Sequence, residues 1–422
     1  MVSYARRETV PHRLPTNTTA RHYPIHRWLN FVAGFSPEFV SAAIEQSGTP
    51  RGGLLLDPFA GLATAPLVAN FEGINAVGFE PHPFFFDIGL AKTQVPDLTQ
   101  VDIVESVFQQ TPAVANLPSV WSPKALEFLQ KLIGPKSLSR LAGARLAESD
   151  CPASARNLYR LMLSRTLEAA TGSKTDGIYK APESTKRPID IEEAAAKIIG
   201  ELRNDLACLP VGMGSTKLYA QSSEHMPQIP SGTVDLCVTS PPYLNNFDFA
   251  EMTRMELYFW NYAANWREIT DTVRAKLIVN TTTAPTTERR RQDHWRALTA
   301  PELLDELDGI IAELSVQRRQ RAGRKEYDSL VLPYFAQMGL VLKEVTRVLK
   351  AGGPIHLVVS DAALYGVHIR TEKLLATLMT SCGLEVKEII RLRDRGGRWV
   401  LAKRQGAADG LGEFHIHAKK VS

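Results

Sequence analysis

The chain has 422 residues, and its 49 Lys and Arg against 45 Asp and Glu give a formal net charge of +4. This near balance excludes a generally polycationic surface, so any surface that binds nucleic acid must be a local patch. Hydrophobic residues make up 44% of the chain and charged residues 22%, which excludes wholesale disorder. The length predicts about two or three domain-sized units, or one domain with large insertions.

The cysteines and the apolar segments indicate in which cellular compartment the protein is expected. Cys151, Cys208, Cys237 and Cys382 lie far apart in the sequence, so they form neither a disulfide framework nor a close-spaced zinc site. The histidines show no metal-ligand spacing either, and we expect no metal. The N-terminus lacks the apolar core of a signal peptide, and the least charged long run, 52–71, contains an Asp, two prolines and several glycines. We therefore expect a soluble, cytoplasmic protein with no membrane partner.

The first part of the chain predicts a strand, a helix and a second strand. Residues 1 to about 20 are polar and predict a loose arm, whereas residues 35–46 predict a helix that opens at Ser-Pro-Glu. Residues 53–57 form a short apolar run that fits a buried strand, residues 64–71 have a helical pattern, and residues 76–80 repeat the strand pattern. Two short strands that flank a helix predict a βαβ unit and hence a parallel sheet.

Two stretches with helical spacing of apolar residues interrupt this strand pattern. Residues 98–215 predict a helical insertion, and a second helical stretch runs from about 250 to 349. The strand pattern resumes between and after these stretches. The further predicted strands are 218–220, 234–239, 355–359, 386–392 and 398–403, with a helix at 371–382. Residues 404–422 are expected to be a C-terminal tail.

Acidic residues end the first two predicted strands. Asp57 is followed by a loop of mostly small residues, and Glu80 comes 23 positions after Asp57. Open α/β sheets bind ligands at this edge, where the loops present backbone N–H groups. A carboxylate at the tip of the second strand can accept hydrogen bonds from both ribose hydroxyls of a nucleoside cofactor. The alternative is an ordinary tight turn next to a solvated strand end.

A second motif, Thr239-Ser240-Pro241-Pro242-Tyr243, follows the apolar residues 234–238. Consecutive prolines cannot continue a strand, because each lacks the N–H that the ladder needs. They predict a rigid loop with a hydroxyl at Ser240, a free carbonyl at Pro241 and an aromatic ring at Tyr243. These groups suit a planar base with an exocyclic amine, whose hydrogens need two acceptors and whose ring can stack. The alternative is a Pro-Pro turn with a packed tyrosine.

These motifs resemble those of the S-adenosylmethionine-dependent amino-methyltransferases that act on DNA bases. The segments DPFAGLATAP, GFEPHP and TSPPYLNNFDF are similar to motifs I, II and IV of that family, and HRWLNFVAGFSPEFV is similar to motif X. Likeness in VTRVLKAGGPIHLVVSD and LYGVHIRTEKLLATLMTSCGLEV extends the resemblance over residues 21–403. The resemblance implies a Rossmann-like, doubly wound methyltransferase sheet, S-adenosylmethionine as cofactor and DNA as partner. A cognate restriction endonuclease is a further candidate partner.

The resemblance also implies roles for individual residues. The implied cofactor-binding residues are Phe35, Ser36, Asp57, Phe59, Ala60, Gly61, Thr64, Glu80, Pro81 and Ser222. Ser240, Pro241, Pro242 and Tyr243 would hold a base that is rotated out of the duplex. Catalysis would rest on alignment and on stabilisation of positive charge at the amine nitrogen, whereas a carbon-5 cytosine methylase needs an attacking cysteine. No cysteine lies in the Pro-Pro loop, and Cys237 is expected in the core.

Three functions fit the motif, and a fourth fits the fold. Ser-Pro-Pro-Tyr, rather than Asp-Pro-Pro-Tyr, is commonest among the N4-cytosine enzymes of the family, so cytosine N4 is the favoured target. An N6-adenine DNA enzyme and an RNA guanine-N2 methyltransferase are the alternatives. The chain departs from the family at Ala63, where a second glycine is usual, and at Ser222, where an aspartate is usual. These departures also leave open a non-catalytic DNA-binding subunit.

Clusters of arginine are the candidate DNA-binding residues. The first cluster lies in 318–325 and includes Arg318, Arg319 and Arg321, and the second consists of Arg289, Arg290 and Arg291. Arginines at 391, 393, 395 and 398 form a third candidate. A solvated helix face explains either of the first two clusters about equally well. The chain is expected to divide into four regions. Residues 21–97 would hold motif X and the cofactor-binding half, and residues 98–215 an insertion with a candidate role in target recognition. Residues 216–403 would form the catalytic half, and residues 404–422 the tail.

Overall fold

A computed structural model of the chain describes residues 19–29, 36–175, 180–181, 186–245, 248–281, 286–320, 325–395 and 410–421. Its centre is a seven-stranded sheet with the order β10-β11-β7-β6-β1-β2-β5. The bounds of these strands are β1 Leu54–Asp57, β2 Asn75–Phe79, β5 Thr216–Tyr219, β6 Leu236–Thr239, β7 Pro354–Ser360, β10 Leu384–Arg395 and β11 Leu411–Lys420. The strands β1, β2, β5, β6 and β7 pair in parallel, and β11 is antiparallel to both of its neighbours. The predicted Rossmann-like, doubly wound α/β sheet is therefore confirmed.

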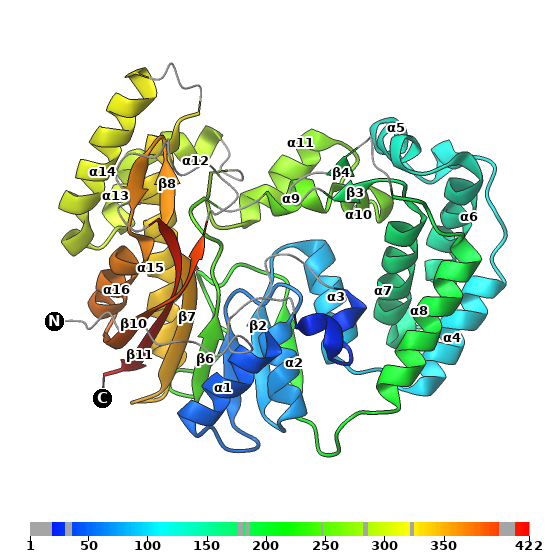
Figure 1. Ribbon diagram of the computed structural model, residues 1–422, viewed down its shortest axis with the longest axis horizontal. Helices are drawn as coiled ribbons and strands as arrows, with labels where there is room; N and C mark the ends of the chain where they lie inside the picture. Colours follow the sequence, from blue (N-terminus) through cyan, green and yellow to red (C-terminus); the bar gives the residue numbers. More distant parts are fainter. Residues whose placement is uncertain are drawn as a thin grey trace.

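Helices cover both faces of this sheet (Figure 1). On one face, α1 (Pro37–Ser47) and α2 (Thr64–Phe71) pack against alternate residues of the central strands, among them Leu55 and Val238. On the other face, α15 (Val331–Val348) and α16 (Thr371–Ser381) pack against the opposite set, which includes Leu56 and Cys237. Successive strand residues point to opposite faces, so a sheet covered on both sides requires consecutive apolar residues, as in Leu54–Leu56 of β1 and Leu236–Val238 of β6.

The stretch that was expected to be a helical insertion forms a block beside the sheet, at the right of Figure 1. Its helices are α4 Leu98–Gln109, α5 Pro123–Leu132, α6 Pro135–Leu146, α7 Ala153–Ala170 and α8 Ile191–Leu206, with the short strands β3 (Lys174–Thr175) and β4 (Lys180–Ala181) between the last two helices. Apolar faces of these helices share one core with α3 (Pro83–Thr93). That shared core attaches the helical block to the sheet through α3. Target recognition by this block stays a prediction.

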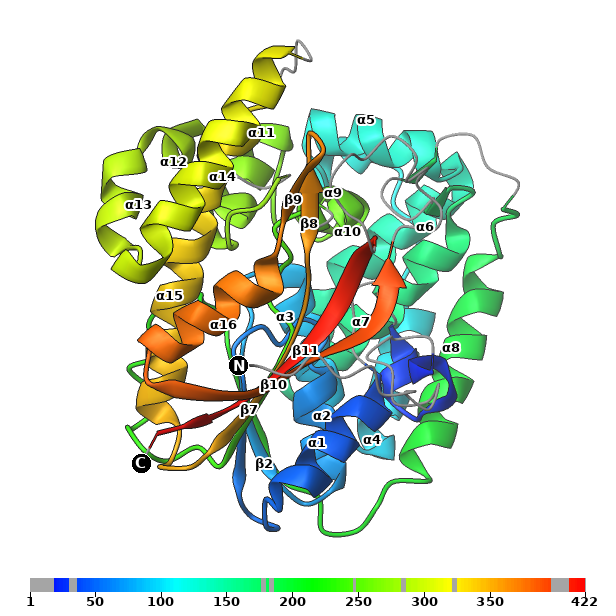
Figure 2. The same cartoon turned by 60° about the vertical axis from the view of Figure 1, so that its left-hand side comes forward.

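The second helical stretch surrounds the carboxyl edge of the sheet. Its helices are α9 Phe249–Met252, α10 Arg254–Phe259, α11 Trp266–Glu268, α12 Thr286–Arg290, α13 Gln292–Leu298 and α14 Pro301–Gln320. A hairpin of β8 (Ala362–Leu364) and β9 (Val367–Ile369) projects beside α14, as Figure 2 shows. The helices α13 and α14 therefore extend the core of the α15 face outward, through Trp295, Leu303 and Leu307.

The C-terminal segment corrects one expectation. Residues 404–422 were predicted to be a tail, but 411–420 form β11, which lies between β7 and β10 and is buried from Leu411 to Ala418. The partner of β10 is therefore this strand, while the predicted strand at 398–403 falls outside the described residues. The sequence pattern did not predict β11, because its buried positions include Glu413, His415 and His417. Polar residues at these positions are typical of an exposed tail.

The N-terminal segment 19–29 is held by one buried carboxylate. Asp205 of α8, 1% exposed, accepts hydrogen bonds from the backbone N–H of Ile25 and the indole N–H of Trp28, both at 2.9 Å, and from the side chain of Arg27. The ammonium of Lys92 donates to the carbonyls of His26, at 3.2 Å, and Leu29, at 2.6 Å. The start of the motif X likeness is thus attached to α3 and α8 by buried polar contacts.

Asp205→Ala should loosen this segment and destabilise the protein. The substitution leaves the N–H groups of Ile25 and Trp28 buried without an acceptor, at a cost of about 1–3 kcal/mol each. Denaturant unfolding should show the loss, and limited proteolysis should cut near residue 25. The control is Asp102→Ala, which removes an exposed ion pair with Arg203 of the same block and should have little effect on the free energy of unfolding. Equal stability of the two variants would contradict the anchoring role.

Candidate functional site

The two sequence motifs meet at the point where the strand order reverses. The chain runs from β1 to β2 on one side and later returns to β6 on the other side, so the loops after β1 and β6 diverge at the carboxyl edge. The hydroxyl of Thr239 donates to Asp57 Oδ1 at 2.7 Å, and the backbone N–H of Phe59 donates to the same oxygen at 3.0 Å. Asp57 therefore joins the first turn to the start of the Pro-Pro loop.

Two buried carboxyl groups lie at this edge. Asp57 is 1% exposed, and burial raises its pKa to about 7, against the hydrogen bonds that lower it. Glu80 is 7% exposed, and burial, with a smaller effect of the Asp57 charge, raises its pKa to about 7. The oxygens of Glu80 accept hydrogen bonds from the backbone N–H of His82, at 2.7 Å, and Gly61, at 2.9 Å. Glu80 thus orders the turn after β1 in addition to ending β2.

These residues fit a nucleoside cofactor. Each carboxylate oxygen has a second lone pair, so Glu80 can still accept hydrogen bonds from ribose hydroxyls. Gly61 has a φ of +53°, and a Cβ atom built on it would meet no atom within 4 Å, so the space in front of the turn is open. Gly78, in contrast, must be glycine for packing, because its Cβ would lie 2.7 Å from Leu218 Cδ2 and 2.9 Å from Ala60 Cβ.

The remaining implied cofactor residues are placed as follows. Ser36 is buried and caps α1 by accepting a hydrogen bond from the N–H of Phe39 at 3.2 Å, and Phe35 lies outside the described residues. Phe59 packs against the core of the α15 face, Thr64 is the first residue of α2, and Pro81 lies between Glu80 and the cap of α3. Cofactor contacts of these side chains stay predictions.

The first departure from the family, Ala63, has a physical consequence. Ala63 is fully buried with φ +60° and ψ 37°, the left-handed region, where an L-residue with a side chain is strained by about 1–2 kcal/mol. The glycine that is usual here would avoid this strain. The Ala63 methyl packs with Ala60 and Leu218 instead, so it contributes to a small core cluster behind the turn.

The second departure, Ser222, lies next to a carboxylate that the sequence did not single out. The Ser222 hydroxyl donates to Glu224 Oε1 at 3.3 Å, and the amide of Gln337 donates to the same oxygen at 3.0 Å. Burial raises the pKa of Glu224. An acidic group is therefore present beyond the end of β5, two positions after Ser222. A search for acids near position 222, rather than at it, would have found this residue.

The Pro-Pro loop is held by three other elements. Ser240 Oγ donates to the carbonyl of Val358 in β7 at 3.1 Å, and Tyr334 of α15 donates its hydroxyl hydrogen to the Pro242 carbonyl at 3.1 Å. The hydroxyl of Tyr243 donates to Glu413 Oε1 of β11 at 3.0 Å. Because these contacts come from β7, α15 and β11, the loop is fixed from outside its own sequence.

These contacts leave two oxygens as acceptors. The Ser240 hydroxyl donates to the Val358 carbonyl and also lies within hydrogen-bond range of the Tyr243 side chain, and with its hydrogen directed to Val358 its lone pairs are left to accept. Pro241 is buried, and its carbonyl accepts no hydrogen bond from any described residue. With respect to the described residues, this carbonyl is therefore open to a ligand that donates a hydrogen bond. The loop thus offers two acceptors next to the ring of Tyr243.

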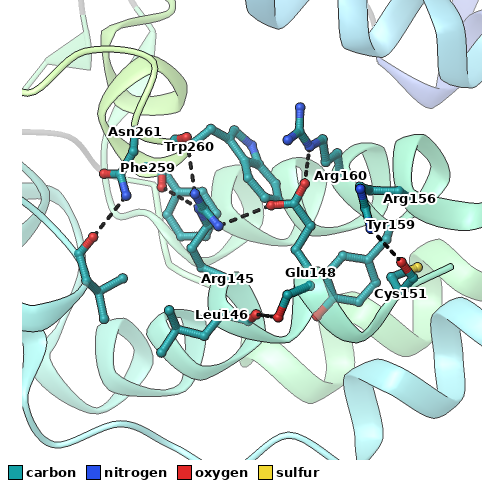
Figure 3. Close-up of polar contacts among 12 residues, drawn as sticks. Arg145, Leu146, Glu148, Cys151, Arg156, Tyr159, Arg160, Phe259, Trp260 and Asn261 are labelled. Carbon is teal, nitrogen blue, oxygen red and sulfur yellow. Dashed lines mark hydrogen bonds and ion pairs between the residues drawn. The ribbon is translucent and has the colours of Figure 1, made fainter. Parts of the chain in front are cut away.

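The segment after this loop is attached to the cofactor side and to the helical block. His82 Nε2 and Thr253 Oγ1, the latter between α9 and α10, lie 2.9 Å apart. Figure 3 shows the next contacts, in which Arg145 donates to the carbonyls of Phe259, at 3.2 Å, and Trp260, at 3.3 Å. Arg145 and Arg160 also share the carboxylate of Glu148. The insertion therefore holds the chain that leaves the Pro-Pro loop.

The arginine clusters differ in their surroundings. Arg318 pairs with Asp328 at 3.0 Å and with Glu326 at 3.7 Å, Arg319 is exposed, and Arg321 lies outside the described residues. The cluster of Arg289, Arg290 and Arg291 is at α12, whose Glu288 is close enough to raise the pKa of Glu224. The N–H of Thr281, just before α12, donates to the Leu244 carbonyl at 3.0 Å. Of these two clusters, the one at α12 is beside the candidate site.

Known proteins resemble the chain over most of its length. The Type II methyltransferase M.BsoBI of Geobacillus stearothermophilus is 22% identical over 92% of this chain and 84% of its own length. The Type II methyltransferase M.AvaI of Nostoc sp. is 22% identical over 91% of this chain and 84% of its own length. The chain is a homologue of the Type II methyltransferases. The relationship confirms the family resemblance of the motifs, and S-adenosylmethionine is the cofactor of this methyltransferase, as the resemblance implied.

Two further comparisons add little. No family model matches the chain. A solved S-adenosylmethionine-dependent methyltransferase of Methanosarcina mazei is 11% identical over 90% of this chain and 97% of that chain, with a TM-score of 0.29. Geranyl diphosphate C-methyltransferase of Streptomyces coelicolor is 8% identical over 94% of this chain and 77% of that chain, with a TM-score of 0.34. TM-scores this low support no conclusion about the methyltransferase.

Across the described ranges, no group of three or more His, Cys, Asp or Glu side chains is arranged to hold a metal ion. Among the helices in the same ranges, none is long and apolar enough to cross a membrane.

The pKa of Glu80 predicts how cofactor affinity depends on pH. A pKa near 7 means that the folded protein without cofactor retains a proton on Glu80 below that pH, whereas only the ionised form accepts hydrogen bonds with both oxygens. Affinity should therefore rise as pH increases from 6 to 8, and calorimetry at several pH values measures it. Glu80→Gln should bind the cofactor more weakly, by about 1.5–3 kcal/mol at pH 8, with a flatter pH profile. Unchanged affinity in Glu80→Gln would refute the assignment of this residue to the cofactor.

Proposed function

We propose that this methyltransferase transfers a methyl group from S-adenosylmethionine to the exocyclic N4 amine of cytosine in DNA. The observation that carries the proposal is the pair of acceptors at Ser240 Oγ and the Pro241 carbonyl, next to the ring of Tyr243. A primary amine on an aromatic ring has two hydrogens to donate, and the pair can accept both. The homology to Type II methyltransferases supports DNA as the substrate.

The chain contributes mainly alignment to this reaction. Bound S-adenosylmethionine supplies an electrophilic methyl group. The amine nitrogen of the base is a weak nucleophile, because its lone pair is delocalised into the ring. Ser240 and Pro241 would hold both amine hydrogens so that the lone pair turns towards the methyl group, and their oxygens would stabilise the positive charge that develops on nitrogen. The nitrogen then loses a proton to solvent.

The neutral hydroxyl at Ser240 favours cytosine as the target base, because a carboxylate at this position suits the adenine enzymes of the family that the motifs resemble. Stacking on Tyr243 would offset part of the free energy needed to unstack the base from the duplex. Adenine N6 presents the same amine geometry, so it is the second candidate. An RNA guanine-N2 activity also fits a Pro-Pro-Tyr loop, but no observation in the structure favours it.

Ser240→Ala and Tyr243→Ala should separate catalysis from binding. Loss of the Ser240 acceptor should reduce the rate much more than the cofactor affinity, because the hydroxyl would touch only the base. Loss of the Tyr243 ring should weaken productive DNA binding by roughly 1–3 kcal/mol. Mass spectrometry of nucleosides from treated DNA and treated RNA identifies the product. N6-methyladenine in place of N4-methylcytosine would refute the base assignment, and undiminished product from Ser240→Ala would refute the acceptor role as well.

Two sets of arginine substitutions should locate the DNA surface. Replacing Arg289, Arg290 and Arg291 by Gln should lower DNA affinity and flatten its salt dependence, by roughly 0.9 in log–log slope for each lost phosphate contact. Replacing Arg318 and Arg319 by Gln is the comparison, and it should change the slope less, because the cluster at α12 is the one beside the candidate site; each set contains one paired arginine, Arg291 with Glu288 and Arg318 with Asp328. The measurement is DNA affinity by fluorescence anisotropy at several salt concentrations. A larger change in the second set would place the DNA surface at the end of α14.

A further inference from the structure

The hairpin of β10 and β11 contacts the Pro-Pro loop through one buried carboxylate. Glu413 of β11 is 4% exposed, and its Oε1 accepts the hydrogen bond of the Tyr243 hydroxyl at 3.0 Å. The two residues are 170 positions apart in the sequence. Figure 2 shows β10 and β11 side by side, and they form one edge of the sheet. A side chain expected to lie in a tail therefore reaches the proposed base-stacking residue.

Arg393 fixes the orientation of this carboxylate. Arg393 of β10 and Glu413 of β11 are register partners in the antiparallel pair, so their side chains lie on the same face. Arg393 Nε lies 2.7 Å from Glu413 Oε2, and Arg393 Nη2 lies 3.2 Å from Oε1. This two-point contact holds the carboxylate plane, whereas a single hydrogen bond would let it turn. Glu413 Oε1 is thus a fixed acceptor for the tyrosine.

The hydroxyl bond restricts the ring of Tyr243. The half-buried ring packs against the apolar core of the α15 face, and the guanidinium of Arg395 lies 5.2 Å from its centroid. Burial and the charge of Glu413 raise the pKa of Tyr243, so the phenol stays protonated and remains a donor. A tyrosine side chain can swing about its Cα–Cβ bond, and a hydrogen bond at its hydroxyl restricts that movement and so fixes where the ring lies, while packing against the core limits how the ring turns about its own axis.

We propose that Glu413, oriented by Arg393, is a positioning residue that fixes where the ring of Tyr243 lies, and hence where the target base can stack on it. The proposal rests on the proposed function, because it requires that Tyr243 contact the base. A base displaced by 1 Å can lose about a hundred-fold in rate, so a hydrogen bond remote from the amine can control the methylation step. The hairpin would then contribute to catalysis without touching the base.

Tyr243→Phe tests the proposal directly, because it keeps the ring and removes the hydrogen bond. It should lower kcat about ten-fold or more, while cofactor affinity stays unchanged. Glu413→Ala should lower kcat by a similar factor. The double variant Tyr243→Phe/Glu413→Ala should be no worse than either single variant, because both substitutions remove the same Tyr243–Glu413 hydrogen bond. Glu413→Gln should fall between wild type and Glu413→Ala, because its one amide oxygen can accept from Tyr243 but its NH2 group cannot accept from Arg393. Single-turnover kinetics on DNA gives these rates, and thermal unfolding verifies that each variant is folded.

Glu388→Gln is the matched control. Glu388 is a glutamate of the same hairpin that lies 3.8 Å from His417 and does not contact the loop, so its neutralisation should leave kcat unchanged. Wild-type kcat in Tyr243→Phe, or rate losses that multiply in the double variant, would overturn the positioning role. Tyr243→Ala separates the two proposals. If it is impaired while Tyr243→Phe is not, only the positioning role fails, and if it is fully active, base stacking fails as well.

Discussion

The hydrogen bond from Thr239 to Asp57 is the contact on which the site depends. It joins the end of β6 to the end of β1 at 2.7 Å, across the position where the order of strands reverses. The loops on the two sides of that position are the one with the proposed cofactor-binding residues, after β1, and the Pro-Pro loop, after β6. Because Asp57 also accepts the N–H of Phe59, one carboxyl group sets the relative position of both loops. Its burial raises its pKa to about 7, so the same contact is sensitive to pH in the physiological range.

Buried polar groups recur around this edge, and each one orients a neighbour. Glu80 holds the turn at Gly61 and the start of α3 at His82, and His82 in turn lies against Thr253 beyond the Pro-Pro loop. Such groups are costly to bury and stay favourable only while their hydrogen bonds are made. The cofactor half and the catalytic half of the site are therefore linked through a series of short polar contacts as well as through the sheet.

The Pro-Pro loop follows a different principle, because its prolines have no N–H groups with which to pair. Its fixed shape comes from Val358, Tyr334 and Glu413, which accept from or donate to the loop from β7, α15 and β11. The orientation of the Ser240 hydrogen towards Val358 makes the hydroxyl an acceptor for a ligand. The chemical character of the loop is thus decided by partners that are distant in sequence.

The sequence alone determined the βαβ unit, the extent of α2, and the loops that begin at the strand ends near Asp57, Glu80 and Ser240. These features depend on local periodicity and on turn-forming residues. The sequence did not determine β11, whose buried glutamate and histidines break the apolar pattern of a core strand and become acceptable only between β7 and β10. Nor did it identify Glu224 or Glu413, since the function of an acidic side chain depends on what lies opposite it. Only the tertiary structure decides which distant N–H, hydroxyl or guanidinium a buried carboxylate meets, because those partners are brought together by packing and not by spacing along the chain.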